Sequence, residues 1–149
     1  MNTADASDMT EIGLVGCVKT KIEEAAPPRK LYNSDYFEKM SSYSENYHDD
    51  WYMMSAKHGI LEPDGEPIEP YNETLRNYTK AEKREWAEGI AKELADKGIV
   101  SEDVTIVIHA GKDYYEELVP LIQDQCADVE IPTEGLGIGE KKAWYKNRL

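Results

Sequence analysis

The stretch Val104-Thr105-Ile106-Val107-Ile108 decides the fold, because every residue in it is β-branched. A short, continuous run of this kind is typical of a strand that is buried on both faces, as in a parallel sheet. Similar short apolar runs occur at residues 12–15, 51–54 and 129–131. We therefore expect a mostly parallel sheet of about four strands.

Helical patterns separate these apolar runs. The clearest begins at Thr79, which Glu82 follows three residues later in the arrangement of a capping box. Pro120 would disturb the helix expected over residues 112–125 if this proline lies well inside that helix. Strands that alternate with helices predict right-handed crossovers, and hence an α/β three-layer sandwich in which helices flank the sheet. We expect the helices over residues 34–46, 79–97, 112–125 and 139–145.

The length of 149 residues is usual for a single domain. Residues 1–10 are polar and lack the basic-then-apolar order of a signal peptide, so we expect a short disordered acidic tail followed by one α/β domain over residues 11–149. No apolar run approaches the roughly 18–20 residues that span a bilayer, which excludes a membrane-spanning helix. We therefore expect a cytoplasmic protein without membrane contact, and the oligomeric state is left open.

The composition is strongly acidic, with 30 Asp and Glu against 17 Lys and Arg and a formal net charge of −13. The acidic residues are spread along the whole chain, which favours a halophilic proteome over an ordinary acidic protein. In either case the net field repels nucleic acid at low salt. Cys17 and Cys126 are isolated in the sequence and make neither a CxxC pair nor a zinc site. We expect no metal and no other cofactor.

In an open parallel sheet, ligands bind beyond the carboxyl ends of the strands. Three loops that follow predicted strands are therefore the candidates for a binding site. The first is Gly16-Cys17-Val18-Lys19-Thr20-Lys21. Cys17 near lysines could have a lowered pKa and act as a nucleophile, although a small packed cysteine is the interpretation we favour for it. For Lys19 we favour a functional role, and Lys21 points the same way if the chain stays extended.

The second loop is Ser55-Ala56-Lys57-His58-Gly59, and small residues at its start leave room for a ligand. Lys57 supplies an anion donor, and His58 can titrate near neutral pH. We expect both to be catalytic and Ser55 to contact the ligand. Tyr71 follows a turn-rich, proline-containing stretch that could hold its ring over the site as a stacking platform. The alternative is a plain surface loop.

The third loop, residues 109–115, opens a helix at Gly111, whose free N–H groups could hold an anion. Lys112 would add charge there, and His109 and Tyr114 are further candidate ligand contacts; a routine strand-to-helix turn is the alternative. Several basic residues fall in these loops, which predicts a positive cluster and an anionic partner: a small molecule, a nucleotide or a nucleic acid. They are Lys19, Lys21, Arg29, Lys30, Lys57 and Lys112.

Six motifs in order, over roughly residues 12–145, resemble an uncharacterised family of microbes and viruses. That family is distantly similar to YaaA-type peroxide-stress proteins and to the uracil-DNA-glycosylase-like domains of tRNA-modifying enzymes. The resemblance implies a ligand that contains a nucleobase. The motifs are Gly-Cys-x-Lys-x-Lys (16–21), Leu-Tyr-x-Ser-x-Tyr-Phe (31–37), Ser-Ala-Lys-His-Gly-Ile-Leu-x-Pro (55–63), Glu-Pro-Tyr (69–71), Ala-Gly-x-x-Tyr-Tyr (110–115) and Gly-Leu-Gly-Ile-Gly (135–139).

The leading hypothesis is therefore an enzyme that acts on a nucleobase, nucleotide or nucleic acid, with a glycosylase-like or transferase-like reaction. His58 would be the general acid or base, and the base would stack on Tyr71 or Tyr114. No Asp or Glu stands in these loops where a glycosylase would hold its water-activating acid, unless Asp113 or Glu69 has that role. Two alternatives stay open: a non-catalytic nucleic-acid-binding protein, and an oxidative-stress protein that uses Cys17.

Overall fold

The computed structural model describes residues 10–17, 22–71 and 73–149, and the statements below concern these residues. Its centre is a five-stranded sheet with the order β3-β2-β1-β4-β5. The predicted α/β architecture with a mostly parallel sheet is confirmed. The parallel strands are β1 (Thr10–Gly16), β2 (Asp50–Ser55), β4 (Val104–His109) and β5 (Asp128–Glu130), and β3 (Gly59–Leu61) is antiparallel to β2.

The edge strand β3 adds a fifth strand to the sheet of about four that the sequence predicts. Residues 55–61 were expected to form only a loop, but Gly59 has a φ of +73° and turns the chain back on itself. Glycine takes this left-handed conformation without the clash that a Cβ would cause. Ile60 then pairs with Met54, and Ser55 pairs with Gly59. The second predicted loop is consequently a tight hairpin.

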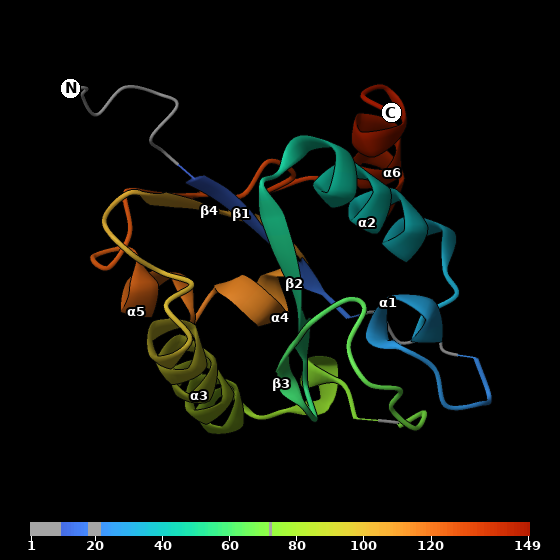
Figure 1. Cartoon of the computed structure of the whole chain (residues 1–149), viewed down its shortest axis with the longest axis horizontal. Helices are drawn as coiled ribbons and strands as arrows, with labels where there is room; N and C mark the ends of the chain where they lie inside the picture. The colour runs from blue at the N-terminus through green and yellow to red at the C-terminus, as the bar shows by residue number, and fades with distance from the viewer. Residues whose placement is uncertain (1–9, 18–21, 72) are drawn as a thin grey trace.

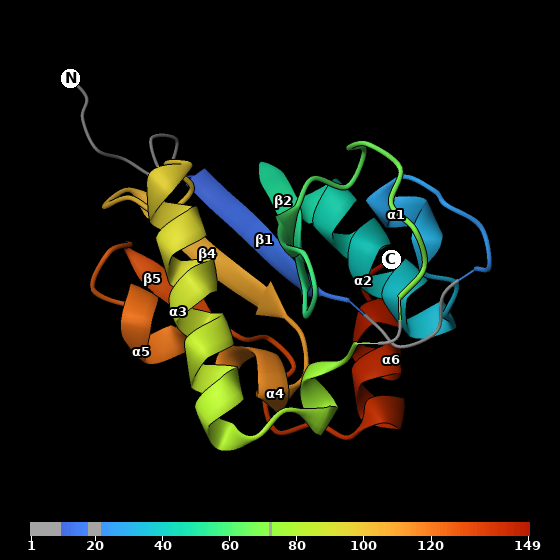
Figure 2. The ribbon, with the colours of Figure 1, turned by 90° about the horizontal axis from the view of Figure 1, so that it is seen from below.

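Helices cover both faces of the sheet, which confirms the three-layer arrangement (Figures 1 and 2). The helix α3 (Lys80–Asp96) packs on one face with the short helices α4 (Lys112–Tyr115) and α5 (Val119–Ile122). The other face is covered by α1 (Pro28–Leu31), α2 (Asp35–Tyr47) and α6 (Ile138–Lys146). In the described part of the chain, no helix combines the length and the apolar character that crossing a membrane requires.

Alternate side chains of the strands fill two separate cores. Leu14 and Ile108 are fully buried on the α3 face, where they belong to the same cluster as Leu94. Val15 and Met53 are fully buried on the α2 face. This is the alternation with a period of two that a strand imposes, and burial on both faces explains why the strands are apolar without interruption.

Local signals place the long helices correctly, and one predicted helix is wrong. Thr79 accepts a hydrogen bond from the backbone N–H of Glu82, and the Glu82 carboxylate accepts one from the N–H of Thr79, so the capping box is present. The helix expected over residues 112–125 is instead two short helices, α4 and α5. Pro120, in the first turn of α5, cannot donate a backbone hydrogen bond, and its ring excludes a helix running through from α4.

Candidate functional site

The carboxyl ends of β1 and β4 lie side by side, and the chain leaves them toward opposite faces of the sheet. This is the point at which a ligand is expected in an open sheet. Here the hydroxyl of Tyr114 donates a hydrogen bond of 2.6 Å to the carbonyl of Cys17. Burial raises the pKa of Tyr114, so its phenol stays protonated at neutral pH. The Tyr114 side chain therefore links the segments that follow β1 and β4. Cys17 is only 7% exposed there.

A buried chain of hydroxyl groups lies next to Cys17. Ser55 Oγ is 2.7 Å from the hydroxyl of Tyr71, which is 2.5 Å from the hydroxyl of Tyr32. Ser55 Oγ also accepts the backbone N–H groups of Lys57 and His58, so its own proton is available to Tyr71. Burial raises the pKa of both tyrosines, and the Cys17 thiol is a further neighbour of each.

A hollow of about 560 Å³ opens beside this chain. The hydroxyl of Tyr78 donates to the carbonyl of Ala56 at 3.3 Å and lies 3.1 Å from a carboxylate oxygen of Glu73. Tyr71 connects the hollow to the buried hydroxyl chain, because it lines the hollow and its hydroxyl belongs to the chain. The residues around this strand-end hollow include Lys57, Tyr71, Glu73, Asn77, Tyr78 and Glu82.

His58 is a neighbour of Tyr71, which lines the strand-end hollow, and its ring lies edge-on to that of Tyr71 at 5.2 Å between ring centroids. Partial burial lowers the pKa of His58, and the charge of Lys57 lowers it further, against an opposing effect of Glu73. The imidazole is therefore neutral at pH 7 and able to accept a proton. Lys57 is exposed and makes no ion pair with another described residue.

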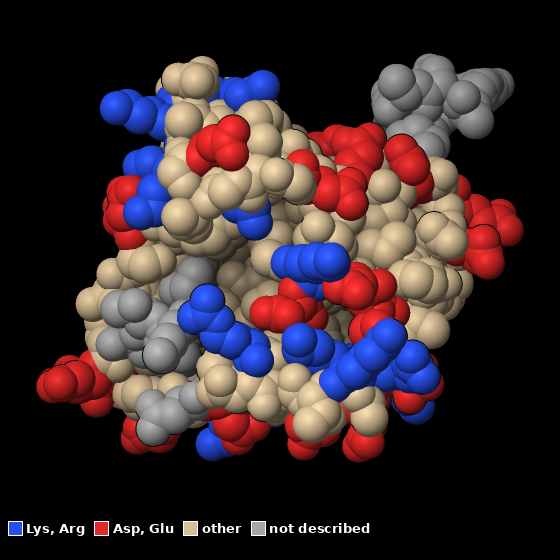
Figure 3. All heavy atoms as spheres, turned by 180° about the vertical axis from the view of Figure 1, so that it is seen from behind, with Lys and Arg blue, Asp and Glu red and all other residues tan. Residues whose placement is uncertain are grey.

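Two of the described residues in the predicted positive cluster, Arg29 and Lys112, pair with carboxylates, whereas Lys30 and Lys57 make no ion pair with another described residue. On the face drawn in Figure 3, Lys and Arg side chains are interspersed with Asp and Glu around a hollow. Lys112 lies 3.7 Å from Glu116, so its charge is partly compensated. Two further pairs join α3 to the segment after β4: Lys83 with Asp113 at 2.8 Å, and Arg84 with Glu117 at 3.3 Å. The expected site residues Lys19 and Lys21 lie outside the described residues.

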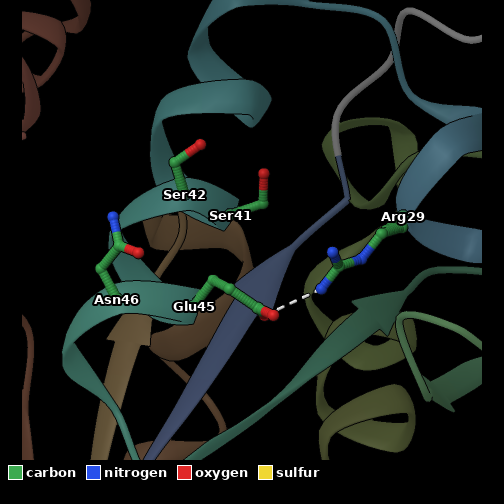
Figure 4. A pocket seen from close by; sticks show the side chains of 5 residues that line it. All are labelled: Arg29, Ser41, Ser42, Glu45 and Asn46. Carbon is green, nitrogen blue, oxygen red and sulfur yellow. Dashed lines mark hydrogen bonds and ion pairs between the residues drawn. The ribbon is translucent and has the colours of Figure 1, made fainter.

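Arg29 pairs with two carboxylates and does not line the strand-end hollow. It borders a smaller pocket of about 190 Å³ on α2, where its guanidinium reaches Glu45 at 2.8 Å (Figure 4). The same carboxylate accepts a hydrogen bond from the indole N–H of Trp51 at 2.6 Å. The hydrogen bond from Trp51, and after it the one from Arg29, lowers the pKa of Glu45. Asp64 pairs with the other side of the guanidinium at 3.1 Å. Arg29 therefore ties α1 to α2 and to the loop after β3.

His109, expected near the ligand, is fully buried on the α2 face and belongs to a different network. Its Nε2 atom is 2.7 Å from Nε2 of His48, and its Nδ1 atom is 2.7 Å from the hydroxyl of Tyr145. His48 Nδ1 is in turn 2.6 Å from a carboxylate oxygen of Glu11. Gly13 makes room for the His48 ring, since a Cβ there would lie 2.6 Å from it. Burial, and then the charge of His48, lowers the pKa of His109 to about 3.

The structure thus brings Cys17, Ser55, Lys57, His58 and Tyr71 together at one end of the sheet. Of the third predicted loop, Tyr114 joins this group through Cys17. Gly111 and Lys112 only begin the four-residue helix α4, and His109 points away.

Sequence reasoning missed Glu73 and Tyr78, which lie in the loop before α3 without a recognisable motif. It also missed His48, which no strand-end rule selects. The described residues include no group of three or more His, Cys, Asp or Glu side chains that could hold a metal ion.

Neither the curated proteins nor the solved structures include a significant match to this chain. One family model matches residues 12–147, which cover nearly all of the sheet and the helices on both faces. The chain therefore belongs to a family of unknown function, DUF6884.

Proposed function

We propose that this chain is an enzyme that acts on a nucleoside or nucleotide in the strand-end hollow. The position of Tyr71 is the observation that carries the proposal. Tyr71 lines the hollow, its ring lies edge-on to that of His58, and its hydroxyl forms a hydrogen bond with Ser55 in the buried chain of hydroxyl groups. An aromatic wall, a neutral imidazole and one lysine suit a planar base joined to a sugar or a phosphate.

The charges around the strand-end hollow favour a small ligand over a nucleic-acid strand. Its described lining holds Lys57 against the carboxylates of Glu73 and Glu82. Proteins that bind nucleic-acid backbones concentrate unpaired Lys and Arg along the contact. The family that the six motifs resemble is distantly similar to uracil-DNA-glycosylase-like domains, and we take that distant similarity as support for a base as the ligand, without requiring a polymer.

The reaction that these groups suit best is cleavage of the bond between base and sugar. Water adds to the sugar carbon, and the carbon–nitrogen bond breaks with its electron pair going to the base, which then takes a proton from solvent. His58 accepts the proton of the attacking water. The Glu73 carboxylate stabilises the positive charge that develops on the sugar, and Lys57 binds a phosphate where one is present.

Titration of the purified protein with nucleosides and nucleotides by NMR, with chromatography to detect released base, tests this proposal. Lys57→Ala is expected to weaken nucleotide binding, and His58→Ala and Glu73→Gln to abolish base release. Lys92→Ala is the matched control, because Lys92 is an exposed lysine of α3, ten residues along the helix from Glu82. If both Lys57→Ala and His58→Ala bind nucleotides as the parent does, the site assignment is wrong. Binding without base release from any of these compounds would refute the reaction.

A further inference from the structure

A second hollow, of about 390 Å³, lies on the α2 face of the sheet, away from the strand-end hollow. Its floor includes Val107 of β4, and it lies between α2 and α6 and reaches the end of β5. The side chains that decide its chemistry are Glu11, Tyr43, His48, Glu130 and Trp144. We call it the α2–α6 hollow.

Two aromatic residues, Tyr43 and Trp144, line the α2–α6 hollow. The rings of Tyr43 and Trp144 lie 5.1 Å apart between centroids and are tilted by 55°. The face of such a ring carries partial negative charge and attracts cations. The chain itself shows this attraction, because the guanidinium carbon of Arg148 lies 3.9 Å from the centre of the Trp144 ring.

Two carboxylates, those of Glu11 and Glu130, also line the α2–α6 hollow. The Glu11 side chain is 42% exposed, and only one of its oxygens makes the hydrogen bond to His48. Glu130 is exposed and makes no ion pair with another described residue. The pKa of Tyr43 is raised, first by burial and then by the charge of Glu11, with a smaller effect of Glu130 and an opposing effect of Arg148. Both carboxylates therefore act on the aromatic wall.

The histidines beneath the hollow need no positive charge of their own. Tyr145 can donate to Nδ1 of His109, Nε2–H of His109 to Nε2 of His48, and Nδ1–H of His48 to the Glu11 carboxylate. Each bond of this series then has one donor and one acceptor. The described lining of the hollow then holds two carboxylates and no lysine or arginine.

We propose that the α2–α6 hollow binds a small organic cation, a quaternary ammonium ion or a protonated amine with an apolar body. The rings of Tyr43 and Trp144 take the apolar body and part of the charge, and Glu11 and Glu130 supply the compensating negative charge. This site shares no lining residue with the strand-end hollow and does not depend on the function proposed for that hollow.

Choline and its neutral isostere 3,3-dimethyl-1-butanol, which differ in one atom and in charge, are the probes. The indole N–H signal of Trp144, assigned with the Trp144→Phe variant, reports binding by NMR. Choline is expected to shift this signal saturably and to bind at least about threefold more tightly than the alcohol. Lys57→Ala, in the other hollow, is expected to leave this titration unchanged.

Two exposed glutamates make the matched pair of variants. Glu130→Gln is expected to weaken choline binding about two- to fivefold, while Glu88→Gln, on α3 at the other face, changes nothing. Arg148→Gln removes a competing positive charge and is expected to strengthen binding. The proposal is overturned if choline and the alcohol bind equally, if choline gives no saturable shift, or if Glu130→Gln and Glu88→Gln behave alike.

Discussion

Replacing His109 with Gln should change how the stability of this protein depends on pH. In the folded chain the pKa of His109 is lowered to about 3, first by burial and then by the charge of His48. In the unfolded chain an exposed histidine has a pKa near 6.5. Between these values the unfolded chain binds a proton that the folded chain does not. His109 therefore makes the folded state progressively less stable as the pH falls from 6.5 toward 3.

The size of the effect follows from the two pKa values. One pKa unit corresponds to about 1.4 kcal/mol, so lowering the pH from 7 to 4 removes about 3 kcal/mol through His109 alone. The variant has no group that titrates at this position. At pH 7 the parent should be more stable by about 1–3 kcal/mol, because His109→Gln disturbs buried hydrogen bonds to His48 and Tyr145. The advantage of the parent should shrink or vanish by pH 4.

Urea unfolding followed by circular dichroism at pH 7, 6, 5 and 4 measures this difference directly. Carboxylates that titrate in the same range act on parent and variant alike, so the comparison cancels them. His58→Gln is the matched control, since His58 is exposed and its loss should change the slope far less. Parallel stability curves for the parent and His109→Gln would refute the reasoning, because they would mean that His109 exchanges protons in the folded state as freely as in the unfolded state.

Three further predictions concern the fold and the cysteines. Thr79→Ala removes one half of the capping box and should lower the free energy of unfolding by about 0.5–2 kcal/mol, measured by urea unfolding. Gly59→Ala forces a Cβ into the left-handed region at φ +73° and should cost about 1–2 kcal/mol in the same assay; a neutral result would mean that the hairpin relaxes freely. Native-state alkylation followed by mass spectrometry should label Cys126, which is half-buried, before Cys17, which is buried; faster labelling of Cys17 would favour the redox alternative.

The parts of the fold that sequence could predict are those set by neighbours along the chain. The apolar run at residues 104–108 and the Thr79–Glu82 capping box each carry their whole signal within a few residues, and both lie where they were predicted. The three-residue strand β3 was missed because its only local mark is Gly59, and its pairing depends on β2. Pro120 indicated that the helix expected over residues 112–125 would be interrupted, but its position within α5 depends on packing.

The candidate site was harder to predict because its partners are distant in sequence. Tyr71 was expected at the mouth of the site, but its hydrogen bonds to Tyr32 and Ser55 span 39 and 16 residues. His48 has its partners 37 and 61 residues away, at Glu11 and His109, and no local pattern marks it. Position after a strand therefore indicates which end of the sheet a residue occupies, but not the face on which its side chain lies.

Charge compensation also depends on partners that are distant in sequence. The charges that remain uncompensated decide which ligand the strand-end hollow can take. Basic residues close to strand ends predicted a positive cluster, yet two of them pair with carboxylates: Arg29 with Glu45, 16 residues along the chain, and Lys112 with Glu116. A chain with 13 excess negative charges has enough carboxylates to compensate most lysines locally. Lys57, which lacks such a pair among the described residues, stands beside a neutral imidazole and an aromatic ring, and that combination suits one phosphate and one base. Nucleotide affinity at this hollow should therefore fall only gently with rising salt, since one released counterion gives a log–log slope near −1, whereas a nucleic-acid backbone spanning several lysines would give a slope several times steeper.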